Sequence, residues 1–154
     1  MAAAINLNDV RRNFIKYTPY CGAVGYSILA ISSMGVEPPS FSDFGRVATF
    51  HTSLCISHFG FAVYFYNRPI LDVVNPPKAK RVLWSVFGTF MMNLGSLLFW
   101  AIAKEVGPEN KLARAVIGLS SAAGLAYVAR DFLHAMDEAR KGILAERVEE
   151  QPKA

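Results

Sequence analysis

Charged residues are missing from three long stretches of this chain. No Asp, Glu, Lys or Arg occurs in residues 17–36, 47–67 or 82–103. A surface helix of a soluble domain keeps a polar face for solvent, and these stretches are almost entirely apolar. Their length is also sufficient for helices that cross a bilayer. The absence of charge therefore favours a membrane protein over a soluble one.

Cysteine and histidine are scarce, with two and three copies in 154 residues. Cys21 and Cys55 form no CxxC pair and lie in apolar stretches, which indicates small buried side chains and no disulfide framework. A bis-histidine haem needs two histidines that face each other at one depth. His51 and His58 share one helix face about 10 Å apart, and His134 lies near a predicted membrane border. The sequence therefore predicts no haem and no other cofactor.

Catalytic and nucleotide-binding motifs are absent as well. The chain contains no Gly-rich phosphate loop, no HExxH sequence and no zinc-ligand spacing. No carboxylate pair falls at membrane depth, and the basic residues lie beside the apolar stretches, where they offer no nucleic-acid-binding surface. We therefore expect a protein that is not an enzyme and that does not bind nucleic acid.

The longest apolar stretch covers residues 82–103, between Arg81 and Lys104. As a helix it would reach about 33 Å, against about 30 Å for the hydrocarbon core of a bilayer. Trp84 and Trp100 lie near its two ends, where indole rings favour the headgroup level. The stretch predicts a membrane-spanning helix with a tryptophan at each border.

Three further apolar stretches complete the predicted fold. Residues 17–36 and 47–67 are long enough to cross a bilayer. Residues 113–133 cross it if Arg114 and Arg130 extend their side chains outward, and a re-entrant hairpin is the alternative for this stretch. The whole chain is thus predicted to form one all-α domain, an integral membrane four-helix bundle.

Amphipathic segments are expected at both ends of this bundle. Residues 8–16 predict a short basic helix in the membrane interface, with a helix start or a bend at Pro19. Residues 131–148 continue as a charged helix whose apolar stripe lies on the membrane surface or against a partner. Within it, Asp137 is expected to pair with Lys141, four residues on.

Basic residues are distributed unequally between the predicted loops. With four spans, twelve Lys and Arg residues fall on the side of both termini and four fall on the other side. This bias places both termini on the cytoplasmic or matrix side. Lys78, Lys80 and Arg81 lie together beside a membrane border, where they form either a patch for anionic lipid headgroups or a topology signal.

Polar residues near the middle of the spans must find partners inside the bundle. His58 and Asn93 each lie about twelve residues after a flanking cation, so they should meet at one depth, about 18 Å along antiparallel helices. Ser27 and Ser121 fall at a comparable depth on the other two spans. These four side chains are read as interior contacts that set helix register, with a substrate or proton path as the alternative.

Small residues are frequent on the first and fourth spans, where they allow helices to pack closely. Ser120 and Gly124 form a small-xxx-small pair of this kind. The sequence therefore predicts a non-catalytic structural or accessory subunit that binds other membrane protein subunits. A small transporter or channel lined by His58 and Asn93 is the alternative, followed by a membrane-embedded lipid enzyme. The absence of N-glycosylation sequons weakly favours the mitochondrial inner membrane over the endoplasmic reticulum.

Overall fold

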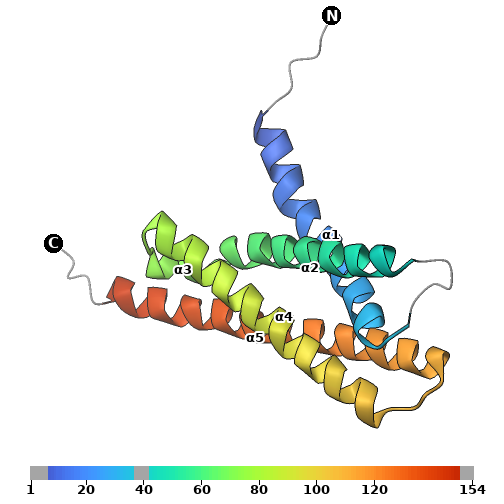
Figure 1. Ribbon diagram of the computed structural model, residues 1–154. Coiled ribbons are helices and arrows are strands. Elements are labelled where there is room, and N and C mark those ends of the chain that lie inside the picture. Colours follow the sequence, from blue (N-terminus) through green and yellow to red (C-terminus); the bar gives the residue numbers. More distant parts are fainter. Residues whose placement is uncertain (1–6, 37–41, 150–154) are drawn as a thin grey trace, which may run out of the picture.

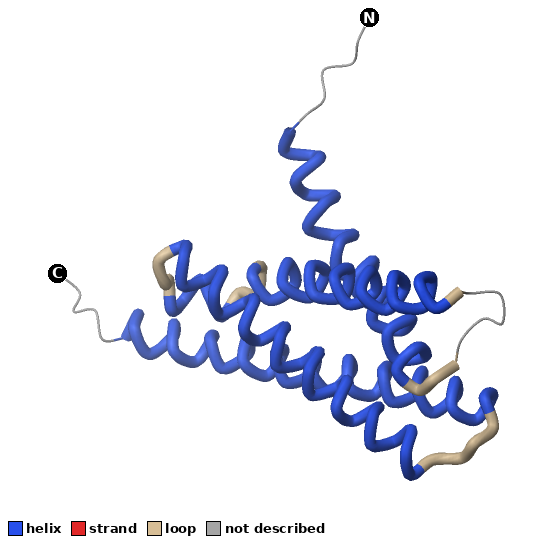
Figure 2. Tube along the Cα trace, viewed as in Figure 1, coloured by secondary structure: helices blue, strands red, loops and turns tan. Residues whose placement is uncertain are grey.

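The computed structural model describes residues 7–36 and 42–149 and is helical apart from short connections (Figures 1 and 2). No strand occurs in these two ranges, so the predicted all-α fold is confirmed. The termini Met1 and Ala154, which were predicted to share one side of a membrane, lie outside the described residues. The helices are α1 (Leu7–Ser33), α2 (Asp43–Tyr66), α3 (Ile70–Val74), α4 (Lys78–Val106) and α5 (Lys111–Glu149).

Two of these helices, α4 and residues 111–145 of α5, are long and apolar enough to cross a membrane. Helices α1 and α2 are not among these candidate spans, and tyrosines, serines and histidines occur within their apolar runs. The structure thus supports two candidate spans directly. Each of the four predicted spans nevertheless falls largely on its own long helix.

The N-terminal flank differs from the prediction of a separate interfacial helix. Residues 8–16 are continuous with the first apolar stretch in α1, and Pro19 lies inside that helix. A proline inside a helix removes one backbone hydrogen bond, here the one to the Ile15 carbonyl, without ending the helix. In Figure 1 the N-terminal turns of α1 project away from α2, α4 and α5. The helix ends at Ser33, where Gly35 takes a φ of 73° that is typical of a helix C-terminus.

The closest helix contact joins α1 to α2. A Cβ atom added at Gly22 would lie 2.7 Å from the Cα atom of Gly60, and one added at Gly25 would lie 3.0 Å from the Ser53 carbonyl oxygen. Only glycine allows two helix backbones to approach so closely, as in small-xxx-small packing of membrane helices. The small residues on the first predicted span therefore serve contact within the chain.

The apolar core lies where the four long helices meet. Tyr26 of α1 is at its centre, with ring centroids 5.2 Å from Phe61 of α2 and 5.1 Å from Trp100 of α4. Trp100 is fully buried, so its indole ring faces the interior of the bundle. Its indole N–H can be buried because Ser121 Oγ of α5 accepts a hydrogen bond from Nε1 at 3.0 Å.

Polarity is reversed on α4 relative to a soluble protein. The buried face of this helix consists of Ser85, Thr89, Asn93, Ser96 and Trp100. The exposed face carries large apolar side chains, among them Leu83, Phe87, Phe90, Leu94 and Leu98. Soluble proteins bury apolar residues first, and extended exposed apolar patches mark contact with a membrane or another protein. The outer surface of α4 therefore belongs in an apolar environment.

Candidate functional site

A polar cluster of three side chains lies between α2 and α4. Asn93 is 0% exposed, and its Oδ1 accepts a hydrogen bond from Ser57 Oγ at 3.0 Å. Its Nδ2 lies 3.0 Å from His58 Nδ1. The structure therefore brings His58 and Asn93 together as their predicted depths required. Ser57 is a third member that the sequence analysis did not single out, although it directly precedes His58.

The imidazole of His58 has two competing neighbours at one nitrogen. His58 Nδ1 lies 3.0 Å from the carbonyl oxygen of Leu54 as well as 3.0 Å from Asn93 Nδ2. A protonated Nδ1 donates to the carbonyl oxygen, whereas an unprotonated Nδ1 accepts from the amide N–H. The tautomer of His58 thus decides whether the bond to α2 or the bond to α4 is made.

The other polar side chains on the buried face of α4 form hydrogen bonds within their own helix. Ser85, Thr89 and Ser96 each donate to the carbonyl oxygen four residues earlier, at 2.8, 2.8 and 2.7 Å. Ser96 Oγ is also hydrogen-bonded to the hydroxyl of Tyr26. Hydroxyls that bond within their own helix need no water, which suits a dry helix interface.

Ser27 and Ser121, the other two predicted interior contacts, have different surroundings. Ser27 is partly exposed, and its hydroxyl donates to the Ala23 carbonyl oxygen of the same helix at 2.9 Å. The structure does not bring Ser27 to the cluster of Ser57, His58 and Asn93. Ser121 does make an interhelical contact, because it accepts the hydrogen bond from Trp100 described above.

The predicted headgroup patch at the start of α4 is divided. Arg81 Nε donates to the Tyr66 carbonyl oxygen at 2.8 Å, and its Nη1 lies 2.8 Å from Asp72 Oδ1. These bonds fix the start of α4 against the end of α2, so Arg81 serves the fold. Lys78 and Lys80 are exposed, and their predicted contact with anionic lipid stays a prediction.

An ion pair that the sequence analysis missed ties α2 to α5. Arg68 and Asp137 form a salt bridge in which their side chains are only 15% and 11% exposed. Asp137 Oδ1 also accepts from the backbone N–H of Ile70, at 2.9 Å. The predicted pair of Asp137 with Lys141 is wrong, because Lys141 bonds Glu138 instead. No spacing pattern marks a pair so far apart in sequence.

The two cysteines and the remaining histidines lie apart from this cluster. Cys21 and Cys55 are exposed, which corrects the prediction that they are buried. They line one apolar groove of about 600 Å³ between α1 and α2. His51 is exposed, and His134 lies 3.9 Å from Glu138 at the surface. Within residues 7–36 and 42–149, no three His, Cys, Asp or Glu side chains are grouped to hold a metal ion.

These observations define a helical protein with an apolar exterior, two candidate spans and a polar interior that is hydrogen-bonded between helices. No protein-family model, curated protein or solved structure matches the chain. The function must therefore be inferred from the geometry of the chain itself.

Proposed function

We propose that this chain is a non-catalytic accessory subunit of a larger membrane protein assembly, inserted through all four long helices. The exposed face of α5 carries this proposal. Ser120 and Gly124 are exposed, and a Cβ atom added at Gly124 would have nothing within 4 Å. The small-xxx-small pair is thus unused within the chain, whereas Gly22 and Gly60 are already packed together.

Small residues on an apolar helix allow the helix of another subunit to approach closely. The flanking side chains Val116, Tyr127 and Val128 are large, apolar and exposed, with exposed fractions of 57%, 67% and 64%. At a spacing of 3.6 residues per turn they lie on the same helix face as Ser120 and Gly124, before and after the two small residues. A membrane-spanning helix of a partner subunit can approach most closely at Ser120 and Gly124 and pack against these apolar side chains.

Orientation and compartment belong to the same proposal. The excess of basic residues in the loops places both termini on the cytoplasmic or matrix side. The mitochondrial inner membrane is favoured over the endoplasmic reticulum by the absence of glycosylation sequons and of cysteines in the non-cytoplasmic loops. Cysteines introduced at Ser42 and Lys153 should be labelled from opposite sides of sealed vesicles. Labelling of both from one side would contradict the four-span topology.

Co-purification in a mild detergent tests the accessory role. We expect neighbouring membrane subunits to co-purify with the native chain, and Gly124→Leu to reduce their recovery several-fold by placing a bulky side chain where the partner helix would approach. Gly142→Leu is the matched control, because Gly142 lies on the same helix beyond the predicted span and also has open space around it. Equal recovery with Gly124→Leu and Gly142→Leu would count against this face as the partner site.

A small transporter or channel is the second candidate, and the buried cluster of Ser57, His58 and Asn93 favours it. An imidazole can take up a proton at one ring nitrogen and release one from the other, which suits a proton path through the membrane. The neighbouring hydroxyls of α4 count against this role, because they donate to carbonyl oxygens of their own helix and do not extend the cluster into a continuous polar path. Flux measured in vesicles with Asn93→Leu separates the two candidates, as developed in the Discussion.

A further inference from the structure

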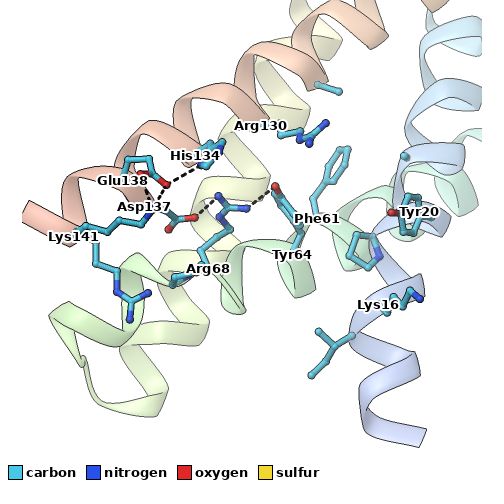
Figure 3. Close-up of a pocket in the computed structure, with 16 residues that line it drawn as sticks. Lys16, Tyr20, Phe61, Tyr64, Arg68, Arg130, His134, Asp137, Glu138 and Lys141 are labelled. Carbon is cyan, nitrogen blue, oxygen red and sulfur yellow. Dashed lines mark hydrogen bonds and ion pairs between the residues drawn. The ribbon is translucent and has the colours of Figure 1, made fainter. Parts of the chain in front are cut away.

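An amphipathic groove of about 790 Å³ opens between α1, α2 and α5. In Figure 3, Lys16 and Tyr20 of α1 lie across the opening from Arg130 of α5, with Phe61 of α2 between them. The groove lies at the end of the bundle where the loops carry most basic residues. It includes neither His58 nor Asn93, so it is distinct from the polar cluster between α2 and α4.

The charges of the groove leave an excess of unpaired cations. Five basic and two acidic residues line it. The acidic residues are already occupied, because Asp137 pairs with Arg68 and Glu138 binds Lys141. The hydrogen bond from Lys141 also lowers the pKa of Glu138 and keeps this carboxylate ionised.

The other three basic residues have no acidic partner among the described residues. Arg130 makes no ion pair, and Lys16 contacts only the ring of Tyr17, at 5.3 Å from its centroid. Arg140 lies ten residues further along α5, about 15 Å from Arg130, and its buried Nε atom has no hydrogen-bond acceptor among the described residues. The cations nearest the apolar part of the groove, Lys16 and Arg130, are therefore the ones free to bind an anionic group.

The inner part of the groove is apolar. Along α5, Ala126 lies one turn deeper than Arg130, and along α1, Ala23 lies about 10 Å deeper than Lys16. Phe61 closes the floor between the two helices. The lining therefore changes from cationic to apolar over about the length of a glycerol backbone and the start of an acyl chain.

We propose that this groove binds one anionic phospholipid, with its phosphate between Lys16 and Arg130 and an acyl chain along Ala23 and Ala126. The inference rests on the membrane placement proposed above. It differs from the partner site on α5, because Gly124 does not line the groove. Variants that lose lipid binding should still co-purify with partner subunits, and variants that lose the partner subunits should still bind the lipid.

Native mass spectrometry of the full chain in detergent tests this site. Phosphatidylglycerol and phosphatidylcholine with identical acyl chains are titrated separately. We expect one phosphatidylglycerol to bind about tenfold more tightly than phosphatidylcholine, since each basic residue adds to the attraction of an anionic headgroup. The double variant Lys16→Gln and Arg130→Gln should remove this preference. Added glycerol phosphate should not displace the lipid, because it lacks acyl chains.

Two further variants show whether the groove itself is responsible. Arg11→Gln with Lys111→Gln removes the same charge from exposed positions outside both the groove and the predicted headgroup patch, and should preserve most of the preference. Ala23→Phe fills the apolar part without changing charge and should weaken binding several-fold; Ala23 is exposed, so its helix can accept the larger side chain.

Equal losses with the two double variants would overturn the proposal in favour of general surface attraction. Unchanged binding with Ala23→Phe, or displacement by glycerol phosphate, would also overturn it, because the ligand would then be a headgroup or a free anion without an acyl chain in the groove.

Discussion

Replacing Asn93 by leucine tests how the buried polar cluster contributes to the fold. The substitution removes two hydrogen bonds between α2 and α4, one from Ser57 and one to His58. Leucine has a similar length but offers no donor or acceptor. The two helices therefore lose the hydrogen bonds that join them in the interior of the bundle, while the bond from Arg81 to the Tyr66 carbonyl oxygen at the helix ends remains.

The expected decrease in the free energy of unfolding depends on which hydrogen bonds Ser57 and His58 make once Asn93 is replaced. A hydrogen bond between membrane helices contributes about 0.6 kcal/mol on average, so two contribute about 1 kcal/mol. Ser57 can turn to a carbonyl oxygen of its own helix, as Ser85 does. His58 can change tautomer and donate from Nδ1 to the carbonyl oxygen of Leu54. No buried group is then left unsatisfied, and the total should be about 1 to 2 kcal/mol, below the several kcal/mol of an orphaned group.

Unfolding of the purified chain in mixed detergent micelles measures this loss. Ser57→Ala should cost about 1 to 3 kcal/mol, at least as much as Asn93→Leu, because it leaves the buried Oδ1 of Asn93 without its hydrogen-bond donor. Ser27→Ala is the control, because the Ser27 hydroxyl bonds only its own helix and is partly exposed. Its free energy of unfolding should stay close to that of the native chain.

The same variant separates the two candidate functions. On the accessory-subunit proposal, Asn93→Leu lowers stability and the yield of the assembly without abolishing any flux. An unchanged free energy of unfolding would refute the energetic reasoning. If stability is unchanged and a transport current is lost, the cluster is a conduction path and the chain is a transporter or channel.

Two other contacts yield predictions of similar kind. Gly60→Ala should destabilise the chain by about 2 to 3 kcal/mol, because its methyl group would overlap the backbone of α1. Gly95→Ala is the control: its methyl group would enter open space, so it should be neutral or stabilising by up to about 1 kcal/mol. Thermal unfolding compares the two variants, and equal effects would contradict the close packing of Gly60. Asp137→Asn should lower the free energy of unfolding by about 3 kcal/mol, because it leaves the largely buried guanidinium of Arg68 unpaired. Lys141→Gln removes a cation from an exposed ion pair and should leave the melting temperature unchanged. Similar shifts in melting temperature for both variants would show that burial does not strengthen the Arg68–Asp137 ion pair.

Sequence alone was sufficient for the helical class and for most of the helix positions. Hydropathy located the long helix containing residues 82–103, because uncharged runs of that length leave few other structures. Matching depths placed His58 opposite Asn93 through simple helix geometry. Both inferences depend on residues that are near one another along a helix or across one short connection, and such relations can be read from spacing.

Contacts between distant segments required the tertiary structure. Gly22 meets Gly60, and Trp100 turns inward to Ser121, because helix rotation and crossing decide which face is buried. Spacing along one helix cannot fix its rotation against another helix. Ser120 and Gly124 resemble the first glycine pair in sequence, yet they face outward. Only the packed helices distinguish a small-residue face used within the chain from one that faces outward.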